Sequence, residues 1–409
     1  MKTFDEDLAA RLMDLREQGL YRELRRVDSP QGARIQINGQ ELLNFSSNDY
    51  LGLANDPVLK AAAAAAVDKY GAGSGASRLV CGSLAPHHEL DEALAAFKGA
   101  PAALSFSSGY ATALGVIGAI LDSNDLILVD KLVHACIVDA ARLSRAKLRV
   151  FAHNDLDNVE RLLRWADRRQ AAAEGNPVHP RILIVTESVF SMDGDQAPLR
   201  GLFELKEKYG AWLMVDEAHA TGLYGKRRRG LAEESGIAQK VEIQMGTLGK
   251  ALGSSGGYIC GSRALIDFLI NRARSFIFST APVPAAAAAA AAGVSFVQSA
   301  AGEERCRRLW ANVAAVSAHR ALVPKGTALA DRRHKAAAII PVMIGDENRA
   351  MDIALRLREQ GVFIPAIRFP TVARGAARLR LTLSAAHTGA DIARMLAALD
   401  AALNPGHPA

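Results

Sequence analysis

The chain has 409 residues, of which 50% are hydrophobic and 22% are charged, a composition typical of globular proteins that excludes a disordered chain. This length is too great for one compact core, so we expect a large domain and a smaller one. The net charge of +6 is spread out, and no nucleic-acid motif lies near the densest basic run, Lys226–Arg229, which we interpret as a solvated loop.

The cysteines and the N-terminus indicate a cytoplasmic protein. The first residues are acidic and lack an apolar core, so they do not resemble a signal peptide. Free thiols in a reducing cytosol are the simplest interpretation of the cysteines. No pair among them has the spacing of a zinc site or a redox pair: Cys81, Cys136, Cys260 and Cys306.

Residues 1–50 predict an N-terminal segment that contains a helix followed by two short strands. The sequence Ser46–Gly52 then leads into the large domain, which we expect to span residues 51–290.

Short apolar runs alternate with helical patterns between residues 100 and 280. This alternation predicts right-handed crossovers and a mainly parallel sheet covered by helices on both faces, which is an α/β fold. The runs that we interpret as buried strands are Ala102–Phe106, Leu126–Val129, Leu148–Phe151, Ile182–Thr186, Trp212–Val215 and Glu242–Met245.

The stretch Ser275–Gly302 carries no charge and could be mistaken for a membrane span. It is mostly alanine, which is only weakly apolar, and it contains Pro282 and Pro284. We interpret it as a buried helix whose small side chains permit close helix contacts, and we expect no membrane association.

Residues 291–409 predict a smaller α+β domain. The expected elements are a helix over Glu303–Arg320, a strand over Ala337–Met343, a helix over Asn348–Gln360, strands over Val362–Ile367 and Leu379–Leu383, and a last helix from Thr388. We expect a loop at Pro324–Asp331.

Residues that follow the predicted strands carry the chemistry, because ligands of such sheets bind beyond the carboxyl ends of the strands. Ser107–Tyr110 is a small-residue turn before a helix, which suits an anion but also occurs in ordinary turns. Asp216 and His219 follow another strand, and three interpretations are open for them: a catalytic pair, a metal-binding pair or a capped turn. Lys250 lies in a glycine-rich turn with apolar neighbours, which could lower the pKa of its amine.

Two common nucleotide-binding motifs are excluded. Gly246–Lys250 has too few residues between its glycines for a Walker A loop, and Ala251 follows the lysine. The glycines of Gly71–Gly75 follow a helix and not a strand, so they are not a Rossmann fingerprint.

An anion-binding turn, an aspartate, histidines and a lysine at strand ends are the groups that pyridoxal phosphate requires. Its phosphate needs N–H and hydroxyl donors, its pyridine nitrogen needs a carboxylate, and its aldehyde needs a lysine.

With these residues in place, the chain resembles the α-oxoamine synthases, which are fold-type-I pyridoxal-phosphate enzymes. The resemblance covers about residues 20–403 and implies a large domain with a mainly parallel, seven-stranded sheet. It rests on the motifs Asn44–Leu53, Gly73–Arg78, Thr186–Asp195, Val215–Gly222, Thr247–Gly253 and Arg378–His387. Within the family, Phe190–Leu199, His153–Asp155 and Ile367–His387 are most similar to the biotin-biosynthetic branch.

The resemblance implies roles around the cofactor. Lys250 would form the Schiff base and move protons at the substrate α-carbon, and Asp216 would pair with the pyridine nitrogen. His219 would bind the phenolic oxygen. His134 would stack on the ring, and the resemblance favours this role over that of a helix-capping histidine. The remaining cofactor contacts would be Gly109, Tyr110, Ser191 and Thr247, with Ser279 and Thr280 contributed from a second subunit.

The resemblance also implies substrate contacts. Arg380 would clamp the amino-acid carboxylate, because a planar guanidinium matches a carboxylate, and Arg378 is a weaker candidate. The other matching positions are Arg25, Asn48, Ser77, His134 and Thr371. The implied reaction joins L-alanine to pimeloyl-CoA, or to pimeloyl-acyl carrier protein, with decarboxylation, in a homodimer with shared active sites.

Two alternatives stay open. Sister enzymes of the family, such as glycine C-acetyltransferase, 5-aminolevulinate synthase and serine palmitoyltransferase, share the core motifs; Asp195 and the C-terminal stretch favour the biotin branch. A catalytically inactive binding protein on the same fold is the other alternative. The complete set of expected site residues speaks against it: Lys250, Asp216, His134, His219 and Arg380.

Overall fold

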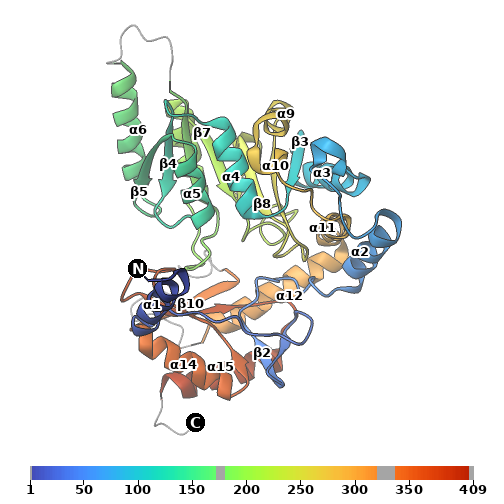
Figure 1. Ribbon diagram of the computed structural model, residues 1–409, viewed down its shortest axis with the longest axis vertical. Helices are drawn as coiled ribbons and strands as arrows, with labels where there is room; N and C mark the ends of the chain where they lie inside the picture. Colours follow the sequence, from blue (N-terminus) through green and yellow to red (C-terminus); the bar gives the residue numbers. More distant parts are fainter. Residues whose placement is uncertain (1, 172–179, 320–336, 405–409) are drawn as a thin grey trace.

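A sheet of seven strands forms the centre of the larger part of the molecule (upper half of Figure 1). The computed structural model describes residues 2–171, 180–319 and 337–404. The strands, in spatial order, are β3 (Ala102–Phe106), β9 (Gly257–Gly261), β8 (Ile243–Thr247), β7 (Trp212–Asp216), β6 (Ile182–Glu187), β4 (Leu126–Asp130) and β5 (Lys147–Phe151). Only β9 runs antiparallel to its neighbours, so the sheet is mainly parallel as predicted.

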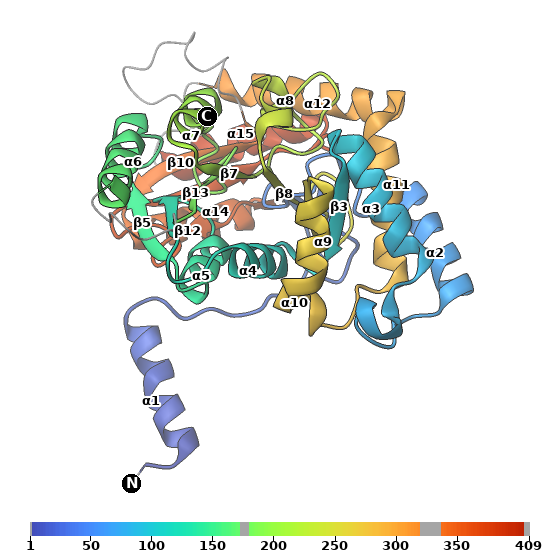
Figure 2. The ribbon, with the colours of Figure 1, turned by 90° about the horizontal axis from the view of Figure 1, so that it is seen from above.

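Helices cover both faces of this sheet (Figures 1 and 2), which is why β3, β4 and β6 are buried along their whole length. One face packs against α4 (Gly109–Ile120), α5 (Ala135–Leu143), α9 (Arg263–Arg272) and α10 (Arg274–Ile277). The other face packs against α3 (Ala85–Lys98), α6 (Leu156–Ala171), α7 (Leu199–Tyr209), α8 (Leu231–Glu234) and α11 (Pro284–Gln298). Shorter elements are the π-helix η1 (Arg78–Gly82) and the 3-10 helix η2 (Ala238–Lys240).

All six predicted strands are present, but the sequence reading missed the seventh strand, β9. It is short and begins and ends with glycine, a residue that disfavours strands. Gly257 is required by packing, because a Cβ there would lie 2.7 Å from Gly109 Cα. A glycine-bounded strand of this kind carries no alternating pattern that could reveal it.

The alanine-rich stretch is not one helix, contrary to the prediction. It contains α10, a connection that includes Pro282, then α11, and Ser299 caps the start of α12 (Ala300–Ser317). The packing of α11 against α2 (Pro57–Tyr70) and α3 confirms that small side chains are buried there. Among the described residues, no single helix is long and apolar enough to cross a membrane; α11 and α12 pass that test only together, and a bend of 76° separates them.

Two three-stranded sheets lie in the lower half of Figure 1. One contains β1 (Arg34–Ile37), β2 (Gln40–Asn44) and β11 (Val362–Phe363), and the other contains β10 (Ile339–Gly345), β13 (Ala377–Thr382) and β12 (Ala366–Ile367). Helix α14 (Glu347–Glu359) packs against both sheets, and α15 (Gly389–Leu403) packs against α14 and α12. The predicted strand Val362–Ile367 is therefore wrong as a single strand: it divides at Pro365, which has no N–H to donate, and its halves join different sheets.

The N-terminal segment has the predicted helix, α1 (Phe4–Glu17), and the predicted pair of strands. Helix α1 buries none of its residues and stands away from the rest of the chain (Figure 2). Strand β2 pairs with β11, so this segment joins the C-terminal part. The predicted boundary at residue 290 falls inside α11, and we propose that the bend at Ser299 divides the two parts. The predicted loop Pro324–Asp331 lies outside the described residues.

Two smaller predictions, on the cysteines and on the basic run, can be compared with the structure. All four cysteines are free, as predicted, and Cys81 alone of them is exposed. In the basic run, Lys226 and Arg227 are exposed, but Arg228 is half-buried and donates to the Val297 carbonyl at 2.9 Å, so only part of this loop is solvated.

Candidate active site

The predicted site residues gather at the carboxyl edge of the large sheet. Asp216 is the last residue of β7, Thr247 is the last residue of β8, and Lys250 lies in the turn that follows β8. Gly109 begins α4 directly after β3 and its turn. Parallel strands end at the same edge of a sheet, so the topology brings these residues together from distant parts of the chain.

Lys250 is in contact with His219: its Nζ lies 2.8 Å from His219 Nε2. Removal of the amine from water lowers the pKa of Lys250 to about 8, although the nearby Asp216 and Glu187 carboxylates raise it. A lysine with this pKa carries an appreciable neutral fraction near pH 7–8 and can act as a nucleophile.

His219 is fixed through both ring nitrogens. On the side opposite Lys250, its Nδ1 lies 2.5 Å from the hydroxyl of Tyr50. Burial lowers the pKa of His219 well below its usual value, so the ring is neutral, and burial raises the pKa of Tyr50 to about 12, so its hydroxyl keeps its proton. The sequence motif Asn44–Leu53 contained Tyr50, but its role as the partner of His219 was missed.

We therefore expect Tyr50→Phe to lower kcat roughly 10- to 100-fold, because groups that orient a catalytic side chain from behind typically contribute this much. The measurement is kcat at saturating substrate. Tyr209→Phe, which removes a surface hydroxyl that hydrogen-bonds Glu160 at 3.1 Å, is the matched control and should leave kcat unchanged. An equal effect of both variants would contradict the role of Tyr50.

Glu187 is a second buried carboxyl beside Asp216, and the sequence reading assigned it no role. The two residues are register partners on β6 and β7, and Glu187 accepts a hydrogen bond from the backbone N–H of His134 at 2.5 Å. Burial, together with the charge of Asp216, raises the pKa of Glu187 to about 8. Its place as the last residue of β6 was the signal that could have identified it.

Asp216 is 4% exposed, and its Oδ1 accepts from the Ala218 N–H at 2.9 Å. Burial raises its pKa, an effect that the positive charge of Lys250 opposes. A cationic group placed against this carboxylate would therefore be stabilised, which is what a protonated pyridine nitrogen provides.

The interaction of Glu187 with Lys250 gives a pH prediction. Because the Glu187 charge raises the pKa of Lys250, Glu187→Gln should lower that pKa below 8. The rate of pyridoxal-phosphate uptake by the cofactor-free protein should rise with pH through about 8 in the wild type, and through a pH lower by roughly one unit in the variant. Absorbance at a series of pH values measures this, with the exposed Glu41→Gln as control; an unshifted profile would contradict the coupling.

The turn at the start of α4 fits an anion. Ser108 caps the helix by accepting from the Ala111 N–H, and the N–H groups of the first turn point out of the helix end. Gly109 permits close approach, since a Cβ there would lie 2.6 Å from Thr247 Cγ2. The buried Thr247 Oγ1 has no hydrogen-bond partner among the described residues, so it is available to a phosphate oxygen. Tyr110 is 43% exposed and its hydroxyl donates to Asp139.

His134 does cap a helix: its Nδ1 accepts from the Cys136 N–H at 3.2 Å at the start of α5. The interpretation of His134 as a helix cap, which the resemblance made the less favoured one, is therefore confirmed by this hydrogen bond. The cap leaves the ring faces and Nε2 uncommitted, and the residue is exposed, so stacking on a cofactor ring stays a prediction.

Arg380 and Arg378 lie on the same face of β13 but have different partners. Within the described part of the chain, the hydrogen-bond acceptors of Arg380 are neutral: the Ser191 carbonyl at 2.6 Å, Thr382 Oγ1 at 2.9 Å and Asn48 Oδ1 at 3.0 Å. Arg378 forms an ion pair with Asp193. The charge of Arg380 is thus the one that remains available to a substrate carboxylate.

The other predicted residues lie farther out. Arg25 and Thr371 are exposed, and it is Arg22, not Arg25, that donates to Thr371, at 3.4 Å. Ser77 precedes η1. Ser279 and Thr280 line a small recess together with Ser107, and whether they serve a second subunit stays a prediction.

Two further observations concern a second cavity and metal binding. A cavity of about 700 Å³ lies at the opposite edge of the sheet, beside Trp212 and Ile243, and none of the predicted site residues line it. Among the described residues, no group of three or more His, Cys, Asp or Glu side chains could hold a metal ion.

The lysine, the buried carboxylate and the anion-binding turn together fit pyridoxal phosphate. Lys250 would hold its aldehyde carbon, Asp216 its ring nitrogen, and Gly109, Tyr110 and Thr247 its phosphate.

Comparisons with known proteins also indicate a pyridoxal-phosphate enzyme. The family model for aminotransferase class I and II matches residues 40–399. The 8-amino-7-oxononanoate synthase of Geobacter sulfurreducens is 48% identical over 392 residues, which cover 96% of each chain.

Solved structures are similar as well. A serine palmitoyltransferase variant from S. paucimobilis, bound to pyridoxal phosphate and myriocin, has a TM-score of 0.86 and 28% identity, covering 97% of this chain and 96% of that one. The 8-amino-7-oxononanoate synthase of Francisella tularensis has a TM-score of 0.70 and 27% identity, covering 88% and 98%. The predicted fold class, cofactor and resemblance are confirmed. The chain belongs to the aminotransferase class I and II family of pyridoxal-phosphate enzymes, and within it to the α-oxoamine synthases that include the 8-amino-7-oxononanoate synthases.

Proposed function

We propose that this enzyme condenses L-alanine with pimeloyl-CoA, or with pimeloyl-acyl carrier protein. The products are 8-amino-7-oxononanoate, carbon dioxide and the free thiol carrier, and one proton is taken up. The relatives' name supports the choice of substrates, and the site supports the type of reaction.

The observation that carries the proposal is the position of Arg380 beside Lys250. A chain of contacts joins the two residues: Arg380 and Tyr50 both donate to Asn48 Oδ1, at 3.0 and 3.4 Å, Tyr50 contacts His219, and His219 contacts Lys250. Every hydrogen-bond acceptor of Arg380 named above is neutral. An amino acid whose carboxylate binds Arg380 would place its α-carbon near the lysine amine. That is the arrangement a reaction at the α-carbon requires.

Bound pyridoxal phosphate supplies an electron sink for the bonds broken at the α-carbon. The residues of the chain set the geometry and move the proton. Lys250, with its lowered pKa, takes the α-proton and later returns a proton to the same carbon. Asp216 would keep a positive charge at the ring nitrogen. His219, oriented by Tyr50 through Nδ1, would hold the phenolic oxygen through Nε2, the nitrogen that Lys250 contacts in the cofactor-free protein. His134 would cover one face of the ring.

We further propose that the enzyme is a cytoplasmic homodimer. An apolar surface surrounds the predicted shared residues Ser279 and Thr280: Phe278 is 72% exposed and Val80 is 77% exposed. A hydrogen bond from the Ala281 N–H to the Ala76 carbonyl joins the two segments that carry them. Large exposed apolar side chains that gather in this way favour burial against a partner.

A substrate panel tests the proposed function. We expect the fastest thiol release with L-alanine and pimeloyl-CoA. Faster release with glycine and acetyl-CoA would overturn the assignment in favour of a glycine C-acetyltransferase. Faster release with L-serine and palmitoyl-CoA would favour a serine palmitoyltransferase, the alternative that the TM-score of 0.86 supports.

A further inference from the structure

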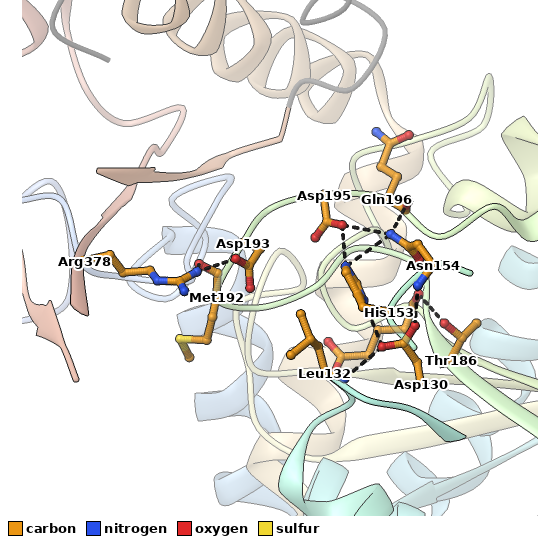
Figure 3. A network of polar contacts seen from close by, with 11 residues as sticks. Asp130, Leu132, His153, Asn154, Thr186, Met192, Asp193, Asp195, Gln196 and Arg378 are labelled. Carbon is orange, nitrogen blue, oxygen red and sulfur yellow. Dashed lines mark hydrogen bonds and ion pairs between the residues drawn. The ribbon is translucent and has the colours of Figure 1, made fainter. Parts of the chain in front are cut away.

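The segment Ser191–Gln196, which follows β6, is held by residues of two different sheets (Figure 3). It approaches the sheet that contains β13 very closely. Gly194 has a φ of +70°, and a Cβ at this position would collide with the Ile339 carbonyl of β10. The contact permits no side chain, so the segment and the β10–β13 pair are packed backbone against backbone.

On the side of the large sheet, the segment is anchored through Asp195. His153 Nε2 lies 2.7 Å from Asp195 Oδ2, and His153 Nδ1 lies 2.9 Å from Asp130 Oδ1 at the end of β4. Asn154 donates from Nδ2 to Asp195 Oδ2 at 2.9 Å and to the Gln196 carbonyl at 3.2 Å. Burial opposes a charge on His153, but its hydrogen bonds with the two carboxylates outweigh this effect and raise its pKa.

On the side of β13, the segment is held by two arginines. Arg378 forms its ion pair with Asp193 and donates to the Met192 carbonyl at 3.4 Å, while Arg380 donates from Nε to the Ser191 carbonyl at 2.6 Å. Arg378 is 6% exposed, so its charge is compensated inside the protein by Asp193. A guanidinium engaged in this way is not free for a substrate.

We propose that Arg378 is a positioning residue for amino-acid binding. Through Asp193 it fixes the segment Ser191–Gln196 against β13, and the Ser191 carbonyl in turn fixes the Arg380 guanidinium. The His153–Asp195 contact keeps the same segment in register with the large sheet, and thereby with Lys250. This inference rests on the proposed role of Arg380 as the carboxylate ligand.

The expected effect is on binding and not on chemistry. Arg378→Gln and Asp193→Asn should each raise the KM for L-alanine roughly tenfold, because one charge-assisted pair is lost while Arg380 remains. The value of kcat should stay within about threefold, and the cofactor should remain bound. The exchanged pair Arg378→Asp with Asp193→Arg should recover a large part of the loss, which an effect of either residue alone would not produce.

Binding is measured directly by titrating the cofactor-loaded enzyme with L-alanine and following its visible absorbance, alongside KM and kcat. Arg181→Gln is the matched control, since Arg181 also pairs with an aspartate, Asp125 at 2.7 Å, but at the opposite edge of the sheet. This control should leave the KM unchanged. Arg380→Lys is the reference for loss of the carboxylate ligand itself.

The outcomes are distinct. If Arg380→Lys raises the KM but Arg378→Gln and Asp193→Asn behave as wild type, the inference is wrong and the proposed function stands. If Arg380→Lys also has no effect, the proposed role of Arg380 fails and the inference with it. If Arg378→Gln does not fold, Asp193→Asn decides, because this substitution keeps the size of the side chain.

Discussion

Replacement of Lys250 by alanine should abolish condensation, with a loss in kcat/KM on the order of 10⁴-fold or more. In the proposed mechanism, the amine at this position, with its pKa lowered to about 8, is both the attachment point for the cofactor and the group that moves the α-proton. Among the residues that the structure describes, Lys250 is the one lysine that hydrogen-bonds His219, so no described neighbour can replace it. The purified wild-type protein should be yellow, and its visible band should be lost or displaced in Lys250→Ala.

Two comparisons make this result interpretable. Lys226→Ala changes an exposed lysine of the basic loop and should behave as wild type. Lys250→Arg keeps a positive charge beside Asp216 and Glu187, so it tests whether the loss follows from the missing nucleophile or from an uncompensated pair of buried carboxyls. A wild-type protein that stays colourless with added pyridoxal phosphate would favour the inactive binding protein. A Lys250→Ala variant with near-normal turnover would exclude Lys250 as the catalytic base.

The second large effect is expected at Asp216. Asp216→Asn preserves shape and the hydrogen bond from the Ala218 N–H but removes the negative charge. Without that charge, a pyridine nitrogen at the site loses its proton, and the ring becomes a poor electron sink. We expect kcat to fall by roughly 10³-fold, in the range seen when a charged orienting carboxylate becomes an amide. Cofactor uptake should persist, because the phosphate turn and Lys250 are intact.

The measurements for Asp216→Asn are kcat and the visible spectrum of the loaded protein. Asp122→Asn, at the opposite edge of the sheet, is the control, since its carboxylate pairs with Arg181 at 2.6 Å at the surface. A loss of activity that is explained fully by loss of bound cofactor would show that Asp216 binds without activating. A kcat within threefold of wild type would remove Asp216 from the mechanism.

Much of the fold could be predicted because its signals are local. The strands β3, β4, β6 and β7 are runs of mostly apolar residues, and the last helix begins after Thr388, where the sequence predicts it. The errors occurred at glycines and prolines, whose effect on an element was decided by the tertiary structure. Strand β9 is framed by glycines, and Pro365 divides a run that reads as one strand between two sheets.

The candidate site was predicted in part for the same reason. Asp216 ends a strand, and Lys250 and Gly109 follow strands, so their place at one edge can be deduced from the order of elements. Tyr50 and Glu187 could not be assigned roles. Tyr50 meets His219 across 169 residues of sequence, and Glu187 meets Asp216 only because β6 and β7 are adjacent.

The sequence by itself determined the type of fold and the cofactor, and it predicted the lysine that would hold it, because periodicity, strand ends and motifs can be read along the chain. Only the tertiary structure decided which of the two guanidinium groups, Arg378 or Arg380, is available to a substrate carboxylate. Both lie on one face of β13, and their difference comes from partners 185 and 189 residues away, Asp193 and the Ser191 carbonyl. The Asp193 carboxylate compensates the charge of one guanidinium and leaves the other available. This difference arises from packing between sheets, which no local sequence pattern encodes.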